Sequence, residues 1–591
     1  MTEETDRLTI IEKTIADNII DNNQNNLMTI AFESLGGATI GYAKVFELVD
    51  IFTKAFLSIG VKNGDIVTVC AAGTLDVVLE FMALNRLGAV VQYVNPNYFK
   101  YNCKKYIDET GCKIMICLDR FYSLIKKEIS ETIVEQLVIT SISEYSSLIW
   151  KILAGKQRIK LEDRIDGVQY FTLKELYKRG KNSKTEFKRI PYVKDKPAVV
   201  TYTSGTTGNP KGVVHTNDGI NNMFSLYDIA GGFGIGVGDR NLVLIPPMYL
   251  TSFVHSIFAP MYRGATNILQ PVYNPKTLGK DLKKYRPKTV VASKAHYIYL
   301  EESGLPKGAL HNTIYAYCGG EAISKTVAER INNILDYYGI GPMVLGYGQS
   351  EFGTMTMFNF DIPNRTNESG ILIPHVKAKI LDPITYREVA EGERGELYIN
   401  TPTVMKEYLN NKEATEAFFV TDENGEKWAK TGDIARVLYR YNGNCVYDVS
   451  GRRSDSFIDE NGKMVYLFDI ETKVEDVEGV REAEVIALTI NKKKVPIVHF
   501  VLKNGYNQQS VVIAVDAKLK SICENKSSIP YAYKVRGSFS TSPISGKRDY
   551  AILCYETDGF IQVMDDGTLS SITLDSAESK VKNELLLSDI R

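Results

Sequence analysis

The sequence predicts an α/β protein, with a large N-terminal domain of mixed sheets covered by helices and a small mobile α+β C-terminal domain. Two observations carry this prediction. Short apolar runs alternate with amphipathic segments over residues 38–96 and again from 198 to about 450, a pattern typical of a mostly parallel sheet with helices on its faces. At 591 residues the chain is also too long for a single ordinary core.

The first elements can be taken in order along the chain. We expect a helix over residues 38–60, a strand over 66–70, a helix over 76–87 and a strand over 89–94. Gly60 and Gly88 end the two helices, because glycine readily adopts the left-handed conformation that follows a last helical turn. From 119 to 195 the alternation loosens, and we expect an insertion there.

The expected insertion is strongly basic. Residues 151–190 hold twelve Lys or Arg against five Asp or Glu, a local net charge of +7, and residues 143–153 read as a short amphipathic helix. Weak peripheral membrane contact through residues 143–190 is one interpretation. The alternative is a helix packed on its own domain beside a solvated basic loop.

Composition narrows the function classes. A net charge of -1 gives no support for nucleic-acid binding, and eight cysteines without metal-ligand spacing indicate free thiols in a reducing cytoplasm. The acidic N-terminus has no apolar core, so we expect no signal peptide. Residues 241–262 carry no acidic or basic side chain, but three prolines interrupt them, which favours a buried strand, loop and helix over a membrane span.

The chain turns short, polar and charged around residues 451–455, and we place a domain boundary there. The expected units are an N-terminal domain over residues 1–453, a mobile C-terminal domain over 454–555, and an acidic tail over 556–591 that contains a helix at 577–587.

Residues 201–212 form the most informative motif, Thr-Tyr-Thr-Ser-Gly-Thr-Thr-Gly-Asn-Pro-Lys-Gly. A short apolar strand is followed directly by residues with hydroxyl side chains, by glycines and by one lysine. Backbone N–H groups and hydroxyls that converge in this way suit a polyanion such as a phosphate chain. The spacing differs from that of a Walker A loop, and a plain Gly/Ser linker is the alternative.

Further candidates follow apolar strands downstream. Tyr347 and Glu351 lie in Gly-Tyr-Gly-Gln-Ser-Glu (346–351), at a strand's carboxyl end where α/β proteins bind ligands. Asp433 stands just before an expected apolar strand, where ribose hydroxyls could be bound, and Arg452 adds a cation nineteen residues later. Lys547 follows a flexible Ser-Gly turn.

These motifs stand in an order that resembles the adenylate-forming (AMP-binding) superfamily of acyl-CoA synthetases, adenylation domains and luciferases. The likeness covers residues 38 to 550 and rests on 202–212, 319–321, 346–351, 431–433 with 451–452, and 545–547. It implies an acid–thiol ligase that uses ATP, Mg²⁺ and coenzyme A. A carboxylic acid becomes acyl-AMP with release of pyrophosphate, and a thiol then takes the acyl group.

The resemblance also implies residue roles. The phosphates would be held by Thr203, Ser204, Gly205, Thr206, Thr207, Gly208 and Lys211. The rest of the nucleotide would be held by Gly320, Glu321, Tyr347, Gly348, Ser350, Asp433 and Arg452, with Glu351 as the Mg²⁺ ligand. Lys547, Glu351 and Thr206 would be catalytic. Ser454 would be the hinge between the domains. Gly462 would line the thiol tunnel, and residues 469–471 would anchor the C-terminal domain for thiol transfer. The acyl pocket would include Tyr249, Leu250, His255 and Gly319.

The substrate follows from what is missing near this pocket. Residues 250–260 contain no acidic side chain that could hold an α-ammonium group, which disfavours amino acids. The insertion at 119–195 looks like that of bacterial medium- to long-chain fatty acyl-CoA synthetases. We therefore expect a cytoplasmic fatty acyl-CoA synthetase. The alternative is a stand-alone adenylating enzyme that loads an acyl or aryl group onto a carrier protein. A non-enzymatic interaction module is less favoured, because the candidate catalytic and binding residues Thr206, Glu351, Asp433 and Lys547 are all present.

Overall fold

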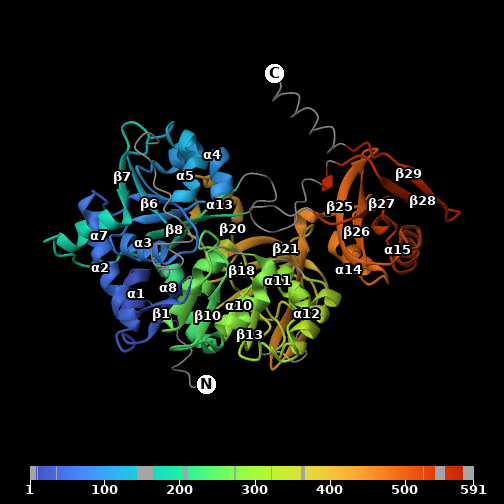
Figure 1. The fold of residues 1–591 in the computed structure, drawn as a ribbon. Helices are drawn as coiled ribbons and strands as arrows, with labels where there is room; N and C mark the ends of the chain where they lie inside the picture. The colour runs from blue at the N-terminus through green and yellow to red at the C-terminus, as the bar shows by residue number, and fades with distance from the viewer. Residues whose placement is uncertain are drawn as a thin grey trace.

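The structure, a computed structural model, shows a large body and a smaller one (Figure 1). The smaller body follows β22 and is drawn in orange to red. The described residues are 8, 11–34, 36–142, 164–203, 210–271, 274–320, 323–360, 362, 366–523, 525–539, 553–554 and 556–576.

One sheet of the large body carries the motif of residues 201–212. In spatial order its eight strands are β19 (Glu407–Tyr408), β9 (Gly212–Thr216), β8 (Pro197–Tyr202), β4 (Val90–Tyr93), β3 (Ile66–Cys70), β5 (Ile114–Leu118), β6 (Gln136–Thr140) and β7 (Gln169–Thr172). The run from β8 to β7 is parallel, and β9 and β19 close one edge in antiparallel fashion. The mostly parallel sheet that the sequence predicts is thus confirmed.

A second sheet carries the other N-terminal motifs. Its nine strands, in spatial order, are β16 (Ile371–Leu372), β15 (Met357–Phe358), β14 (Val344–Tyr347), β13 (Tyr315–Gly319), β12 (Thr289–Val291), β10 (Arg240–Val243), β11 (Thr266–Leu269), β1 (Ile30–Ser34) and β2 (Ala38–Gly41). The central strands from β14 to β1 are parallel, so the carboxyl ends of β13 and β14 lie at the same edge.

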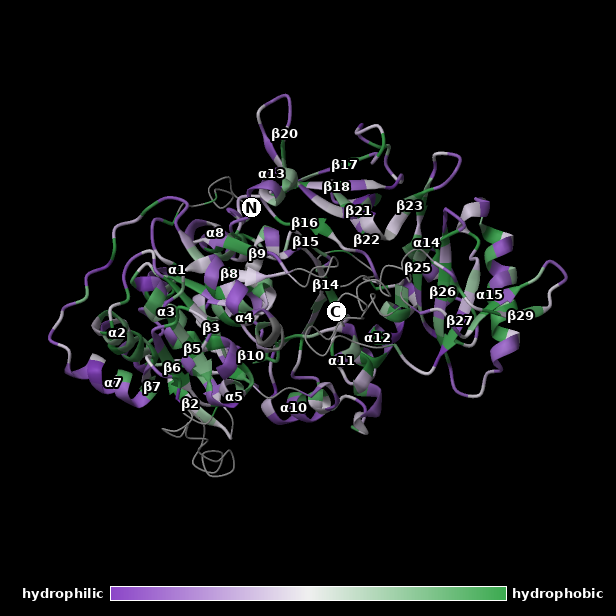
Figure 2. Cartoon of the chain, turned by 90° about the horizontal axis from the view of Figure 1, so that it is seen from above, coloured by the Kyte–Doolittle hydropathy of each residue, from purple (hydrophilic) through white to green (hydrophobic). Residues whose placement is uncertain are grey.

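Helices pack on these two sheets. Those of the large body are α1 (Ile15–Asn22), α2 (Tyr42–Ser58), α3 (Leu75–Arg86), α4 (Pro96–Thr110), α5 (Asp119–Ile129), α7 (Leu173–Asn182), α8 (Asn217–Ile229), α9 (Ala259–Tyr262), α10 (Leu278–Tyr285), α11 (Lys294–Tyr299), α12 (Lys325–Tyr337) and α13 (Lys412–Phe418), with a π-helix, η4 (Ser252–Phe258). Short 3₁₀ turns are η3 (Gly231–Gly234), η5 (Pro275–Thr277), η6 (Leu300–Ser303), η7 (Ser350–Phe352) and η8 (Arg453–Asp455). Figure 2 shows polar residues along α7, which covers α2 at the periphery.

A third sheet leads to the smaller body. Its strands are β17 (Lys377–Leu381), β18 (Gly395–Asn400), β21 (Lys427–Tyr441), β20 (Phe419–Thr421) and β22 (Asn444–Arg452). The smaller body holds the hairpin β23 (Ser456–Ile458) and β24 (Met464–Tyr466), and a sheet of β25 (Val480–Ile490), β26 (Lys493–Leu502), β27 (Ala532–Arg536), β28 (Phe560–Val563) and β29 (Leu569–Ile572). Its helices are α14 (Leu467–Glu475), α15 (Gln508–Ile522) and the 3₁₀ turn η9 (Lys526–Ser528).

The smaller body has a core of its own. Phe457, Val474, Val498, Val515 and Tyr533 are buried together, on strands and helices that all follow β22. A large N-terminal and a small C-terminal domain are therefore confirmed, while the exact boundary near residue 453 stays a prediction.

Several predicted elements need correction. The helix expected over 38–60 begins only at Tyr42, because residues 38–41 pair with β1 as a strand. Residues 119–195 are no simple insertion, since β6 and β7 extend the eight-stranded sheet. The expected tail over 556–591 includes β28 and β29, which continue the C-terminal sheet beside β27. The helices expected at 143–153 and 577–587 lie outside the described residues.

The uncharged stretch 241–262 is, as expected, part of the core. It contains the end of β10, a loop, η4 and α9, and its side chains from Ser252 to Met261 are buried. Across the described ranges, no helix combines the length and the apolar character needed to cross a lipid bilayer.

Candidate active site

The hairpin of β8 and β9 holds the ends of the predicted phosphate loop. Tyr202 lies opposite Gly212 in the antiparallel register. The backbone N–H of Thr203 donates to the carbonyl of Lys211 at 3.0 Å, and the N–H of Lys211 donates to Thr203 Oγ1 at 3.3 Å. The loop is therefore pinched at its base. Its middle residues Ser204, Gly205, Thr206, Thr207 and Gly208 lie outside the described residues.

A tyrosine connects the predicted metal ligand to the loop lysine. Tyr408 Oη donates to Glu351 Oε1 at 2.7 Å, and Lys211 Nζ lies 4.7 Å from the centroid of the same ring. Burial raises the pKa of Glu351, and the Tyr408 hydrogen bond opposes this shift. The carboxylate is held in a fixed position close to a cation, a combination suited to Mg²⁺ and phosphate oxygens.

A buried histidine supports the backbone of the same motif. His215 on β9 is fully buried, and its Nε2 contacts the carbonyl oxygen of Ser350 at 2.6 Å, so Nε2 carries the proton. Burial lowers the pKa of His215 to about 4. A neutral imidazole therefore fixes the peptide between Ser350 and Glu351.

Asp433 is the centre of a second group of polar side chains. Tyr347 Oη and Gln349 Nε2 both donate to Asp433 Oδ2, at 2.8 and 2.7 Å. Asp433 is 7% exposed, and Arg452 Nε lies 3.6 Å from its Oδ1. Asp433 lies within β21, contrary to the expected position before a strand, and the β21–β22 register sets it opposite Arg452.

Close backbone approach explains the glycines at the strand ends. A Cβ on Gly319 would lie 2.7 Å from the carbonyl oxygen of Gly346, and one on Gly348 would lie 1.4 Å from that of Thr354. Gly320 has φ +84°, which favours glycine. The carboxyl ends of β13 and β14 are thereby brought together, and Tyr347 is the last residue of β14. Glu321 lies outside the described residues.

Among the expected acyl-pocket residues, His255 contacts a residue that follows the 346–351 motif. His255 on η4 is 5% exposed, hydrogen-bonds through Nε2 to Thr354 Oγ1, and stacks on Tyr227 with ring centroids 5.5 Å apart. Burial lowers its pKa to about 3, so the ring is neutral. Leu250 is buried, and Tyr249 Oη accepts a hydrogen bond from Asn95 Nδ2 at 3.3 Å.

Four contributing residues were not predicted from the sequence. Gln349 lies inside a quoted motif without an assigned role, and Thr354 follows that motif closely, whereas His215 and Tyr408 act from separate segments. Thr354 has φ +107°, a strained conformation for a β-branched residue and one often found at functional sites. The short spacing from Glu351 to Thr354 is the one sequence signal for it.

The predicted hinge residue lies between the two bodies, and the predicted thiol-tunnel residue lies in the smaller body. Ser454 is exposed in η8, directly after β22, and Gly462 has φ +77° in the turn between β23 and β24. Arg394 Nη2 of the large body contacts Asp469 Oδ1 of the smaller one at 2.7 Å. Lys547 lies outside the described residues.

The site thus gathers a cation, a fixed carboxylate and an aspartate–arginine pair at the strand ends of an α/β protein, an arrangement suited to a nucleotide. The AMP-binding enzyme family matches residues 21–409. The chain therefore belongs to the AMP-binding enzyme family, and the predicted class, an AMP-forming acid–thiol ligase, is confirmed.

Relatives are named as acyl-CoA ligases, and solved structures share the fold. The long-chain-fatty-acid–CoA ligase of Bacillus subtilis (strain 168) is 26% identical over 484 residues, 78% of this chain and 82% of that protein. The mitochondrial medium-chain acyl-CoA ligase ACSF2 of Danio rerio is 26% identical over 457 residues, 76% and 72% of the two chains. ATP-bound MatB from Rhodopseudomonas palustris shares the fold, with a TM-score of 0.75 at 18% identity over 91% of this chain and 98% of that one. The anthranilate CoA ligase AuaEII, in complex with anthranoyl-AMP, has a TM-score of 0.74 at 17% identity over 94% and 98%.

Proposed function

We propose that this enzyme converts a medium- or long-chain fatty acid into its acyl-AMP, with release of pyrophosphate, and then transfers the acyl group to the thiol of coenzyme A. The observation that carries the proposal is the assembly of Lys211, Glu351, Asp433 and Arg452 around two tyrosines. Relatives named as long-chain and medium-chain acyl ligases support the choice of acid.

In the first half-reaction, a carboxylate oxygen of the acid attacks the α-phosphorus of ATP, and the bond to the β-phosphate oxygen breaks. Thr203 and Lys211, with the loop between them, would hold the departing pyrophosphate. Asp433 would accept hydrogen bonds from the ribose, with Arg452 beside it. Since little covalent work falls to the protein in phosphoryl transfer, positioning and charge neutralisation dominate.

Glu351 fits a magnesium ion through the chemistry of its donors. One oxygen is held by Tyr408, and the cationic Lys211 stands beside the same ring. Mg²⁺ usually takes one or two carboxylates and completes its shell with substrate phosphates and water. The ion would supply neutralisation of charge on the phosphate oxygens. Within the described ranges, no three His, Cys, Asp or Glu side chains cluster as a ready-made metal cage.

In the second half-reaction, the thiol sulfur attacks the acyl carbon, the bond to the AMP oxygen breaks, and the thiol proton is released. We propose that the smaller body turns about Ser454 between the two steps, so that Lys547 serves the first step and the turn at Gly462 serves the second. The support for this is the position of Ser454 between two bodies with separate cores.

An uncharged acyl chain is the favoured substrate. Leu250 is buried and His255 is neutral, and the segment 250–260 contributes no carboxylate to pair with an ammonium group. A charged amine left unpaired in such surroundings would be strongly disfavoured.

The test is pyrophosphate release across a panel of fatty, aryl and amino acids, with and without coenzyme A. We expect release with medium- or long-chain fatty acids and formation of acyl-CoA. Product assays with coenzyme A against a pantetheinylated carrier protein separate the two thiols. Release with aryl acids alone, or acyl transfer to the carrier alone, would contradict the proposal.

A further inference from the structure

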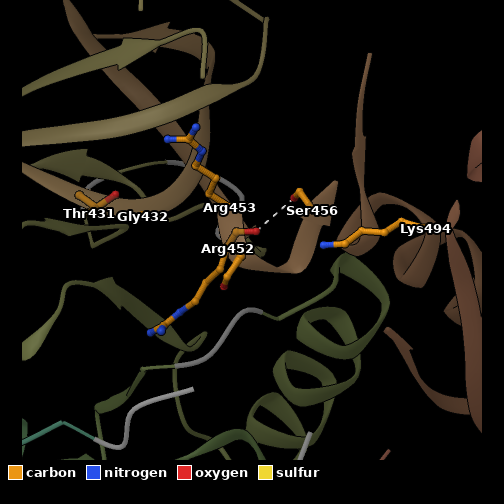
Figure 3. A pocket seen from close by; sticks show the side chains of 7 residues that line it. Thr431, Gly432, Arg452, Arg453, Ser456 and Lys494 are labelled. Carbon is orange, nitrogen blue, oxygen red and sulfur yellow. Dashed lines mark hydrogen bonds between the residues drawn. The ribbon is translucent and has the colours of Figure 1, made fainter. Parts of the chain in front are cut away.

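A polar cavity of about 490 Å³ lies where the two bodies meet (Figure 3). Its walls come from β21, from the end of β22 with the turn η8 and the first residue of β23, and from the start of β26 in the smaller body. Figure 3 shows Lys494 reaching from β26 toward Ser456 and the backbone of Arg452, while the Arg452 and Arg453 side chains leave in opposite directions.

The cationic side chains of this cavity differ in how they are neutralised. Arg453 Nη1 donates to Glu396 Oε2 at 2.7 Å, which largely compensates its charge. Arg452 Nε forms an ion pair with Asp433 Oδ1 at 3.6 Å, a distance too long for a good hydrogen bond, so its charge is partly compensated. Lys494 makes no ion pair with any described residue. Lys494 is therefore the lining cation that the described part of the protein leaves without an ion pair.

The neighbouring lysine shows how Lys494 comes to line the cavity. Successive side chains on a strand point to opposite faces. Lys493 forms an ion pair with Glu460 at 2.7 Å, on the turn between β23 and β24. Lys494, the next residue on β26, lines the cavity. The two lysines share a hairpin and differ in their surroundings, which makes Lys493 a matched control.

We propose that this cavity is a phosphate subsite, completed by Lys494 from the smaller body, that binds a phosphate group of a nucleotide substrate. The inference rests on the proposed function, since acid activation and thiol transfer supply two such molecules, ATP and coenzyme A. Neither Thr203, Lys211 nor Glu351 lines the cavity, so it is separate from the described part of the triphosphate grip. An ammonium group and an arginine are a common pairing for phosphate oxygens.

The experiment compares Lys494→Ala with Lys493→Ala in the full-length enzyme. KM and kcat are measured for ATP in pyrophosphate release, and for coenzyme A, dephospho-coenzyme A and pantetheine in thioester formation. We expect Lys494→Ala to raise KM for one nucleotide substrate about tenfold, as loss of one charge-assisted hydrogen bond would, with kcat within about twofold. Lys494→Arg should restore most of the affinity, and Lys493→Ala should behave as wild type.

The KM values for the different substrates identify which molecule supplies the phosphate group. A raised KM for coenzyme A but not for pantetheine assigns the subsite to the nucleotide end of the thiol, and a smaller effect with dephospho-coenzyme A assigns it to the 3′-phosphate. A raised KM for ATP alone assigns it to the adenylation step. Unchanged KM values for all ligands, or a loss of kcat alone, overturn the subsite.

Failure of the proposed function has a different signature. If wild type releases no pyrophosphate with any acid, the fatty-acid assignment fails and no KM or kcat values can be compared between the variants. Calorimetric titration of ATP and of coenzyme A into wild type, Lys494→Ala and Lys493→Ala then decides the subsite. Weaker binding of one nucleotide specific to Lys494→Ala supports it, and equal or absent binding in all three overturns it.

Discussion

Asp433 shows how single residues prepare this site for a nucleotide. Its Oδ2 accepts from both Tyr347 and Gln349, so the carboxylate is oriented by the protein itself, and its Oδ1 faces Arg452 without a short hydrogen bond. A preoriented acceptor needs little reorganisation when a ribose hydroxyl arrives. Glu351, the last residue of the 346–351 motif, is held in the same manner by Tyr408.

Replacing Glu351 by Gln should weaken Mg²⁺-dependent adenylation. The amide keeps the shape but removes the negative charge that would bind the cation, so we expect pyrophosphate release to fall by about 10²- to 10³-fold and the Mg²⁺ dependence to shift to higher concentration. Initial rates over a Mg²⁺ titration measure this. Glu407→Gln, an exposed neighbour of Tyr408, should change neither quantity. An unchanged Mg²⁺ profile in Glu351→Gln would exclude the metal role.

Replacing Lys547 by Ala should separate the two half-reactions. We expect acyl-AMP formation to fall by about 10²-fold or more, because a positioned cation would be lost from the developing charge, while thiolysis of supplied acyl-AMP is largely kept. Pyrophosphate release and thioester formation from synthetic acyl-AMP are the two readouts. Lys526→Ala, an exposed lysine of the same body, serves as the control. Equal loss of both activities would show that Lys547 does not act in the first step alone.

Among the elements, α3 is unusual because it is buried along its whole length. All twelve of its residues are buried, including Glu80, which is 0% exposed. Neither carboxyl oxygen of Glu80 has a hydrogen-bond partner in the described ranges. Burial, and then the nearby charge of Asp76, raise the pKa of Glu80 well above its usual value. The folded protein therefore keeps Glu80 protonated to a higher pH than the unfolded chain does.

This difference predicts a stabilising substitution. Above the usual pKa of about 4.5 the unfolded chain releases the Glu80 proton more readily, so wild type loses stability as pH rises until Glu80 also ionises in the folded state. Glu80→Met, of similar length and apolar, should raise the free energy of unfolding by about 1–3 kcal/mol at pH 7. The gain should be larger at pH 8 than at pH 5.

Urea unfolding of wild type and Glu80→Met at the two pH values measures the effect. Glu47→Met on the exposed face of α2 provides a comparison with the same chemical change. A gain that does not depend on pH would show that Glu80 does not titrate between these conditions, and a loss of stability would show that its carboxyl is satisfied.

For the whole molecule, the described polar contacts across the two bodies are few. Arg394 reaches Asp469 at 2.7 Å, and Thr326 Oγ1 donates to Asp476 Oδ1 at 2.7 Å. Arg394 also donates to Ser450 Oγ at 2.6 Å on its own body. Contacts of this number and exposure are compatible with a smaller body that reorients, because each partly exposed pair contributes little.

Breaking one of these contacts should affect the half-reactions unequally. If residues 469–471 anchor the arrangement used for thiol transfer, Asp469→Asn should slow thioester formation about three- to tenfold, because a shift of about 0.7–1.4 kcal/mol in the equilibrium between arrangements is lost. Pyrophosphate release should stay within about twofold. Rapid-quench measurement of both products tests this, with Asp566→Asn on the distant β28–β29 turn as the control. An equal fall in both rates would exclude a selective anchor.

The sequence alone determined the class of this protein. Alternating strands and helices indicated the mostly parallel sheets, and motifs of fixed composition and order identified Lys211, Tyr347, Glu351, Asp433 and Arg452 as candidates. Both signals are local, because periodicity and motif spacing are read within a few turns of chain. For the same reason they carried no information on the start of α2 at Tyr42 or on the sheet membership of β28 and β29, which depend on strand partners elsewhere.

Only the tertiary structure decided which side chains meet. Tyr408 holds Glu351 from 57 residues away, His255 reaches Thr354 across 99 residues, and Lys494 lines a cavity with Arg452 through the docking of two bodies. A hydrogen bond between distant segments needs only one donor in one segment and one acceptor in the other. It therefore does not change the hydrophobic periodicity of either segment, and the sequence pattern does not reveal it. The chemistry was therefore readable from the motifs, and the contacts that orient its residues had to come from the fold.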